Sequence, residues 1–97
     1  MSSEPPSIII TGATSAIGRS VARRFANRGW HVGLLDPDAA ALDQLADTLP
    51  EADRVFVDAL DPTDADAVRS GLDAFAEEAG GRLQVLVNAA GVRRSGG

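Results

Sequence analysis

Two glycines that bracket hydroxyl side chains carry the first chemical signal of this sequence. Gly12 and Gly18 enclose Thr14 and Ser15, directly after the apolar run 8–10. Gly12 permits a tight turn, and Gly18 falls in the first turn of a predicted helix, where free backbone N–H groups and the helix dipole favour an anion. Such a turn can bind a phosphate group. The plainer alternative is a turn glycine followed by a close-packing glycine, and two glycines alone do not decide between them.

Thr14 and Ser15 are suited to donate hydrogen bonds to phosphate or ribose. The chain has a single histidine, His31, which lies inside a predicted strand, where a structural role is the simpler interpretation. Because no histidine is placed as a general base, neither hydroxyl is expected to act as a nucleophile. The arginines that follow Gly18 are interpreted as the solvated face of a helix.

Three later apolar runs also end in polar side chains, at Asp36, Asp58 and Asn88. A carboxylate at the position of Asp36, after a strand and about twenty residues beyond a glycine turn, can accept hydrogen bonds from an adenosine ribose and repels a 2′-phosphate. NAD is therefore favoured over NADP. The alternative for Asp36 is a turn former before Pro37.

Asp58 and Asn88 each keep two interpretations at this stage. Asp58 can accept from an adenine amino group, with Ala59 against the ring, or it can end a turn before Pro62. Asn88 can tie its strand to a neighbour through backbone bonds, or it can stand at a simple strand-end turn. Spacing alone does not choose between these roles.

The polar residues are placed by alternating predicted strands and helices. Apolar runs predict strands over 8–10, 30–35, 55–57 and 83–87, and helical spacing predicts helices over 17–28, 38–49 and 63–79, the last opened by Thr63 with Asp66 as a capping box. Strands that alternate with helices indicate an α/β fold with a doubly wound parallel sheet. We expect the order 3-2-1-4, with the first two helices on one face and the third on the other. The polar strand ends then meet at the carboxyl edge, beside the switch point of the sheet.

Composition narrows the classes of partner. The net charge is −5 without a basic cluster, so nucleic acid is not an expected partner, and no apolar run is long enough to span a bilayer. With no cysteine and one histidine, neither a disulfide framework nor a transition-metal cluster is expected. We expect a cytoplasmic protein with a disordered tail over residues 1–6 and one domain over residues 7–97.

Two motifs resemble those of the short-chain dehydrogenase/reductase family. TGATSAIG, which begins at Thr11, resembles the TGxxxGxG cofactor loop, and LVNAAG, which ends at Gly91, resembles the NNAG motif. The resemblance implies that the chain is part of a Rossmann-type fold that binds a dinucleotide. The implied and derived cofactor-binding residues are Gly12, Thr14, Ser15, Ala16, Ile17, Gly18, Asp36, Asp58, Ala59, Asn88, Ala89 and Gly91.

The resemblance assigns these residues to parts of the cofactor. The glycine loop would line the pyrophosphate and ribose, Asp36 would select NAD, Asp58 and Ala59 would hold adenine, and residues 88–91 would lie along the nicotinamide-side ribose. Ser15 is neutral where NADP-preferring relatives often carry a basic residue. Ala16 replaces the middle glycine of the loop, which is expected to weaken cofactor binding, and Ala89 replaces the second asparagine of NNAG.

The family's catalytic residues have no counterpart in this sequence. Its hydride transfer uses a serine and a tyrosine four residues before a lysine, all beyond the NNAG strand, and this chain contains neither tyrosine nor lysine. We therefore expect the chain to be the NAD-binding N-terminal part of an oxidoreductase that interconverts alcohols and ketones, inactive on its own, whose full-length parent forms a homo-oligomer. The alternative is a non-enzymatic module that senses NAD or binds another protein.

Overall fold

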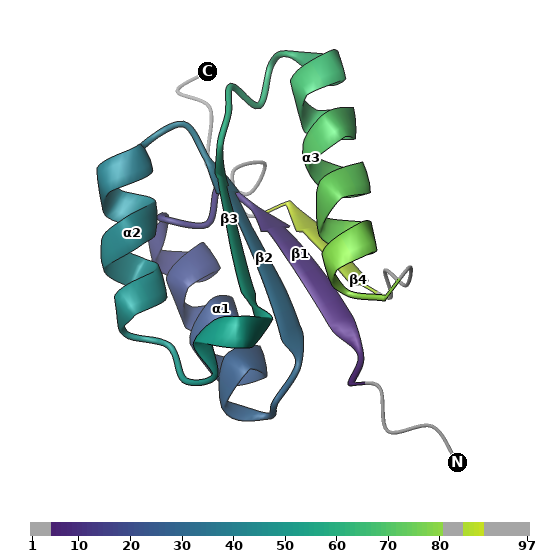
Figure 1. The fold of residues 1–97 in the computed structure, drawn as a ribbon. Coiled ribbons are helices and arrows are strands. Elements are labelled where there is room, and N and C mark those ends of the chain that lie inside the picture. Colours follow the sequence, from purple (N-terminus) through teal and green to yellow (C-terminus); the bar gives the residue numbers. More distant parts are fainter. Residues whose placement is uncertain (1–4, 81–84, 89–97) are drawn as a thin grey trace.

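The computed structural model describes residues 5–80 and 85–88. Strands, α-helices and one 3-10 helix follow one another along the chain (Figure 1). In order they are β1 (Ser7–Thr11), α1 (Ala16–Asn27), β2 (His31–Asp36), α2 (Ala39–Asp47), η1 (Ala52–Arg54), β3 (Val55–Ala59), α3 (Ala65–Glu78) and β4 (Val85–Asn88). The predicted alternation is confirmed. Of the predicted fourth strand, residues 83 and 84 lie outside the described residues.

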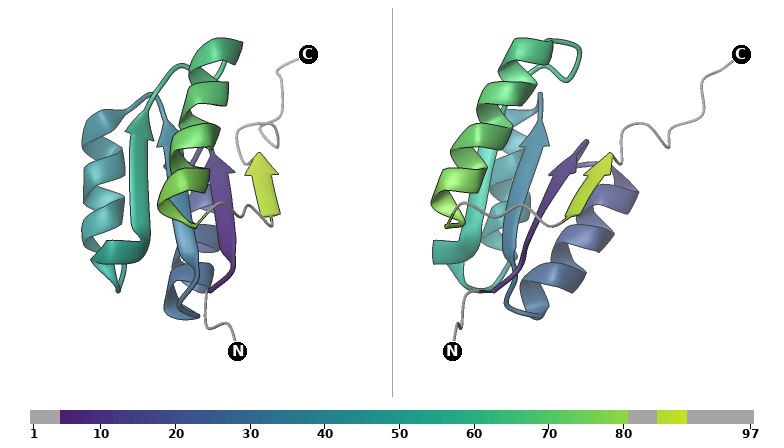
Figure 2. Two further views of the ribbon diagram at one scale, coloured as in Figure 1. Left: turned by 45° about the vertical axis from the view of Figure 1, so that its right-hand side comes forward. Right: turned by 90° about the vertical axis from the view of Figure 1, so that its right-hand side faces the viewer.

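The sheet is parallel and has the predicted order β3-β2-β1-β4. Figure 2 shows α1 and α2 on one face of the sheet and α3 on the other. This arrangement follows from right-handed crossovers that run outward from β1 to β3 and then return past β1 to β4. The described part of the chain is therefore a partial Rossmann-type doubly wound sheet, as predicted.

The central strand is buried on both faces. Ile8, Ile9 and Ile10 are each 0% exposed. Successive strand residues point to opposite faces, so Ile8 and Ile10 pack with the residues beneath α1 and α2, whereas Ile9 packs with Phe75 of α3. A continuous apolar run is what a strand covered on both faces requires.

Aspartates cap the second and third helices. The Asp38 side chain accepts a hydrogen bond from the Ala41 N–H, and the Asp64 side chain accepts from the N–H groups of Asp66 and Ala67. The predicted capping box at Thr63 is wrong. Thr63 instead donates its hydroxyl to Asp61, 2.7 Å away, and α3 is capped one residue later because Asp64 satisfies two of its free N–H groups.

The outer strand β4 is less well covered than β1. Leu86 is 55% exposed and Val85 is 36% exposed. A cavity of about 180 Å³ lies between α3 and the neighbouring strands, lined by Thr11, Pro62, Val68, Leu72, Leu86 and Asn88. Within the described residues, α3 therefore covers the β2 side of this face more fully than the β4 side (Figure 2).

Gly33 allows α3 to lie close to the sheet. A Cβ atom added to Gly33 would lie 2.9 Å from two ring carbons of Phe75 and 3.1 Å from Ile9 Cγ1. Phe75 is only 1% exposed and has little room to move away. The sheet therefore needs a residue without a side chain at this position in β2.

We predict that Gly33→Ala destabilises the chain by about 1–3 kcal/mol, because the added methyl group overpacks the interface with Phe75. Thermal unfolding followed by circular dichroism measures the effect. Phe75→Leu provides the matched control: its combination with Gly33→Ala should cost less than the sum of the two single changes, because they share one contact. Equal melting temperatures for Gly33→Ala and the unchanged chain would contradict this account.

Candidate functional site

The loop between β1 and α1 turns tightly at Gly12. Gly12 has a φ of 67°, in the left-handed region that favours glycine. The Gly12 carbonyl oxygen accepts two hydrogen bonds from Ser15, one from its N–H at 3.1 Å and one from its hydroxyl at 2.8 Å. The Ala13 N–H donates to the carbonyl oxygen of Leu35 in β2 at 3.1 Å. The loop is thus fixed both within itself and to the neighbouring strand.

Gly18 holds the start of α1 against this loop. A Cβ atom on Gly18 would lie 2.5 Å from the Gly12 carbonyl oxygen and 2.7 Å from the Ala13 carbonyl oxygen. These contacts are with backbone atoms, which cannot rotate away as a flexible side chain can. The close-packing alternative for Gly18 is therefore confirmed, and it is compatible with an anion-binding role for the same turn.

Ser15 caps α1 and shapes what the helix start presents. Its hydroxyl oxygen accepts from the Gly18 N–H at 3.0 Å while donating to Gly12. Ala16 and Ile17 occupy the first helical positions, and both are exposed, Ile17 by 45%. A helix N-terminus with exposed first residues lies at the carboxyl edge of the sheet, where the sequence predicted it.

Asp36 ties the end of β2 to the glycine loop. Its Oδ2 accepts from the Thr14 N–H at 3.2 Å and from the Thr14 hydroxyl at 2.8 Å, and its Oδ1 accepts from the Asp38 N–H at 3.0 Å. The residue is only 8% exposed. The bond to Asp38 is the turn-forming role considered for Asp36, and the two bonds to Thr14 add a long-range contact that spacing did not indicate.

The end of β3 lies next to Asp36. Ala59 pairs with Asp36 across the sheet, and the Leu60 N–H donates to the Asp36 carbonyl oxygen at 3.1 Å. Asp58 is half-buried under α3, where a Cβ atom on Gly71 would lie 3.2 Å from Asp58 Oδ2. The structure therefore brings Ala59 beside Asp36, whereas Asp58 pairs with Leu35 and its side chain lies on the opposite face of the sheet, toward α3.

Asn88 lies at the same edge on the far side of β1. It pairs with Thr11, and the Thr11 hydroxyl donates to Asn88 Oδ1 at 2.9 Å. The tie between the strands thus includes a side-chain bond in addition to the expected backbone ladder. Ala89 and Gly91 lie outside the described residues.

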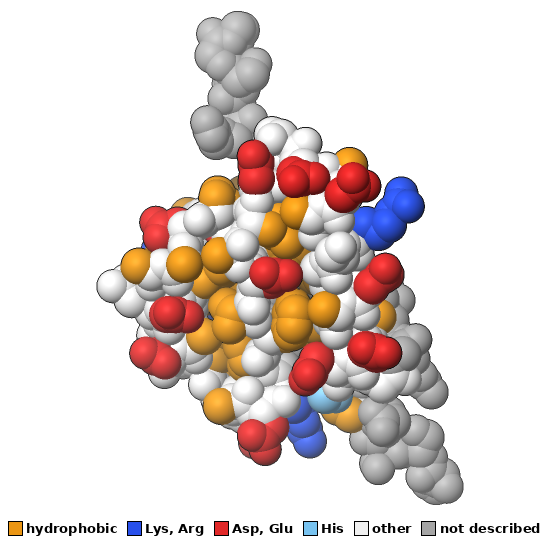
Figure 3. All heavy atoms as spheres, turned by 45° about the horizontal axis from the view of Figure 1, so that its top comes forward, with side chains coloured by type: hydrophobic (Ala, Val, Ile, Leu, Met, Phe, Trp, Pro, Cys, Tyr) orange, Lys and Arg blue, Asp and Glu red, His pale blue; other side chains and the backbone are white. Residues whose placement is uncertain are grey.

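Acidic side chains outnumber basic ones on one face of the molecule. Figure 3 shows Asp and Glu side chains spread over this face around an apolar centre, with few Arg side chains among them. In the loop after β3, the Thr63 backbone N–H and hydroxyl hold the pKa of Asp61 below its ordinary value of 3.8. Among residues 5–80 and 85–88, no group of three metal-ligating side chains occurs, and no helix is long and apolar enough to cross a membrane.

Comparison with known proteins places this geometry in a family. The model of the family described as short chain dehydrogenase matches residues 6–97. The chain belongs to the short-chain dehydrogenase family. It is 44% identical over 85 residues to sulfoacetaldehyde reductase 2 of Chromohalobacter salexigens. The aligned segment covers 88% of this chain and 33% of that protein.

Solved structures of the family share the fold. A 3-ketoacyl-(acyl-carrier-protein) reductase from Brucella melitensis complexed with NADH has a TM-score of 0.75 and 29% identity, over 88% of this chain and 34% of its own. An actinorhodin polyketide ketoreductase with NADPH has a TM-score of 0.79 and 28% identity, over 91% and 34%. The chain thus spans about a third of the length of these relatives. The match lies in their N-terminal, cofactor-binding portion.

Family membership favours the oxidoreductase interpretation over the non-enzymatic module. Ala16, which replaces the middle glycine of the family's cofactor loop, has an exposed side chain at the start of α1. The methyl group of Ala16 is accordingly compatible with the fold. Its expected effect on cofactor binding stays a prediction.

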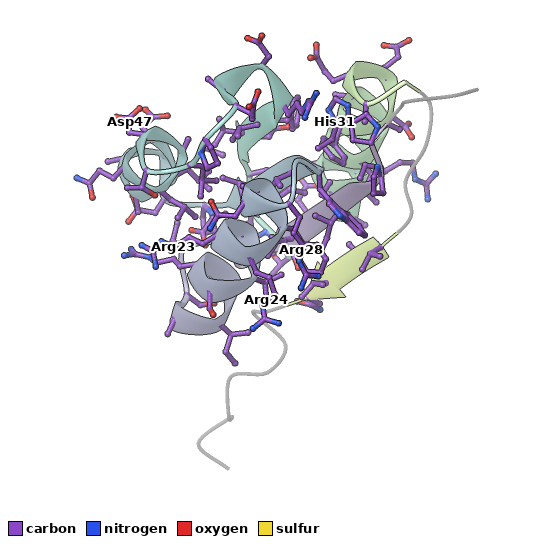
Figure 4. The ribbon with its side chains drawn as sticks, turned by 90° about the horizontal axis from the view of Figure 1, so that it is seen from below. Arg23, Arg24, Arg28, His31 and Asp47 are labelled. Carbon is purple, nitrogen blue, oxygen red and sulfur yellow. The ribbon has the colours of Figure 1, made fainter. Side chains whose placement is uncertain are left out.

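Arg19 is a site residue that the sequence interpretation missed. Its Nε donates to the Thr14 carbonyl oxygen at 2.8 Å, so this arginine supports the short-chain dehydrogenase loop. Arg23, Arg24 and Arg28 are exposed, as a solvated helix face requires (Figure 4). One indication of this contact was present in the sequence: Arg19 directly follows Gly18 in the first turn of the helix, close enough along the chain to reach the loop.

His31 lies away from the loop. It is the first residue of β2 and pairs with Ser7 of β1. Both residues lie at the amino end of the sheet, and Figure 4, which is seen from below, labels His31. Its distance from the carboxyl edge agrees with the structural role expected for it.

We predict that Ser15→Ala destabilises the chain by about 1 kcal/mol, since α1 loses its N-cap and the Gly18 N–H loses its acceptor. The melting temperature measured by calorimetry reports the loss. Ser20→Ala is the matched control, because Ser20 is an exposed residue within the same helix. If both variants melted at the same temperature, the Ser15 cap would not contribute to stability.

Proposed function

We propose that this chain binds NAD at the carboxyl edge of its sheet, as the cofactor-binding part of a short-chain oxidoreductase that interconverts alcohols and ketones by hydride transfer. The observation that carries the proposal is the buried carboxylate of Asp36 beside Thr14 of the glycine loop. A carboxylate beside the glycine loop, at the carboxyl end of β2, supports this proposal because it can accept hydrogen bonds from an adenosine ribose.

Each part of the cofactor has proposed contacts. Thr14 and the loop residues Gly12, Ser15, Ala16, Ile17 and Gly18 line the pyrophosphate and its ribose. Asp36, Asp58 and Ala59 hold the adenosine, and Asn88, Ala89 and Gly91 lie along the nicotinamide-side ribose. Asp36 and Ala59 are paired on neighbouring strands, which supports the proposal that both contact the adenosine.

NAD is the proposed cofactor rather than NADP. The family fold accommodates both, since one relative was solved with NADH and another with NADPH. The choice therefore depends on side chains near the adenosine ribose. The Asp36 carboxylate repels a 2′-phosphate, and the neutral Ser15 offers it no positive charge. The net charge of −5 acts in the same direction.

The cofactor, when bound, supplies or accepts the hydride. The chain's own residues bind and orient it, and the sequence offers no tyrosine or lysine to donate or accept the proton of the substrate. We propose that residues 7–97 form the cofactor-binding half of a longer enzyme, with residues 1–6 as a tail outside it. A cytoplasmic location and assembly into a homo-oligomer belong to the same proposal, and the absence of cysteine is compatible with a reducing compartment.

Asp36→Ala tests the proposal. Loss of hydrogen bonds to a charged acceptor should weaken NAD binding by about 10- to 100-fold, while NADP binding should improve because the repulsion is removed. Isothermal titration calorimetry with both dinucleotides gives the affinity ratio. Asp43→Ala, which removes an exposed carboxylate from α2, controls for net charge and should leave the ratio unchanged. An unchanged ratio in Asp36→Ala would exclude Asp36 as the selecting residue.

A further inference from the structure

Arg19 is the charged side chain nearest to the glycine loop along the chain. It is the only charged residue between residues 5 and 22. Its Nε donates to the Thr14 carbonyl oxygen at 2.8 Å, and the residue is exposed. A guanidinium is always charged at physiological pH. The hydrogen bond therefore holds a positive charge beside the loop.

Thr14 separates this positive charge from the negative charge of Asp36. The Thr14 N–H donates to Asp36 Oδ2 at 3.2 Å, and the carbonyl oxygen of the same residue accepts from Arg19. The backbone nitrogen and oxygen of one residue are at most about 3.6 Å apart. Arg19 Nε therefore lies within about 10 Å of Asp36 Oδ2, a separation comparable to the Debye length of about 8 Å at physiological salt. At this separation, the charge of Arg19 acts on the space around Asp36 without a direct contact.

NADP differs from NAD by a phosphate group on the adenosine ribose, which adds about 1.5 to 2 negative charges near neutral pH. Building on the proposed NAD-binding function, we propose that Arg19 is a second specificity-determining residue, whose positive charge opposes Asp36 and limits the preference for NAD. Asp36 repels the additional phosphate, whereas Arg19 attracts it. The affinity ratio of the two cofactors then depends on the balance of both charges.

Coulomb's law gives the expected size of this effect. At about 10 Å and at effective dielectric constants between about 20 and 80, one unit charge changes the affinity for another by about 2- to 16-fold. The exposure of Arg19 favours the lower part of this range for each unit charge, because water and salt screen an exposed group. The phosphate carries more than one charge, so we expect an effect of about three- to tenfold.

Arg19→Gln separates the charge of Arg19 from its hydrogen bond. Glutamine carries Nε2 on the same side-chain carbon that carries Nε in arginine, so the bond to Thr14 can remain while the positive charge is removed. Isothermal titration calorimetry with both dinucleotides gives the Kd for NADP divided by the Kd for NAD. We expect this ratio to rise about three- to tenfold, and any effect through the shared pyrophosphate cancels in it. An unchanged ratio would overturn the inference.

Two further variants are the controls. Arg19→Lys keeps the positive charge and should keep the ratio within about twofold of that of the unchanged chain. Arg28→Gln removes an exposed positive charge nine residues further along α1, about 13 Å along the helix axis, and should leave the ratio unchanged. An equal rise of the ratio in Arg28→Gln would assign the effect to net charge instead of to the position of Arg19, and would overturn the inference.

The Asp36→Ala background decides the matter if the unchanged chain binds NADP too weakly to measure. Adding Arg19→Gln to Asp36→Ala should weaken NADP binding about three- to tenfold more than it weakens NAD binding. Equal weakening for both cofactors would overturn the inference while leaving NAD binding intact. An unchanged chain that binds no NAD would instead overturn the proposed function, and the inference with it.

Discussion

The fold depends on the burial of β1 from both sides. Ile8, Ile9 and Ile10 each lose all contact with solvent, which is possible only when helices cover both faces of the sheet. Burying a side chain of this size contributes about 1.5–3 kcal/mol, so three consecutive residues outweigh any single polar contact in the chain. A strand covered on both faces in a parallel sheet must be joined to its neighbours by crossovers, and those crossovers bring every strand end to one edge.

At that edge, polar side chains connect elements that the core alone would leave independent. Thr11 binds Asn88 across β1 and β4, and Thr14 binds Asp36 across the loop and β2. Leu60 extends the connection to the end of β3 through the Asp36 carbonyl oxygen. The carboxyl edge therefore carries two groups of hydrogen bonds above an apolar core, one at Thr11 and Asn88 and one around Asp36, and the strand register determines where they lie.

The sequence predicted the strands, the helices and the strand order because these depend on local periodicity and on the handedness of crossovers. It also located the polar strand ends, since the carboxyl ends of parallel strands meet at one edge. The contact between Thr14 and Asp36 joins residues that are distant along the chain, and no local pattern encodes such a bond. Arg19 was missed for a similar reason, because one face of an amphipathic helix can be either solvated or folded back onto the preceding loop.

Close approaches between elements were equally hidden from the sequence. Gly33 sits inside an apolar strand, and only the position of Phe75 on α3 shows why a side chain is excluded there. The cap of α3 shows a finer limit. Thr63 and Asp64 are both good N-cap residues, and the choice between them depends on Asp61, which engages Thr63 and leaves Asp64 to the helix.

The double role of Asp36 links stability to cofactor choice. Its three hydrogen bonds hold the loop, β2 and the start of α2 together, and the same carboxylate carries the proposed preference for NAD. A neutral residue at this position would admit a 2′-phosphate, but it would also leave the Thr14 and Asp38 donors without their shared acceptor. A change of cofactor preference at this site therefore costs stability unless a second change restores those bonds. The loop and the end of β2 consequently act as one unit, in which neither side can change alone without loss of stability.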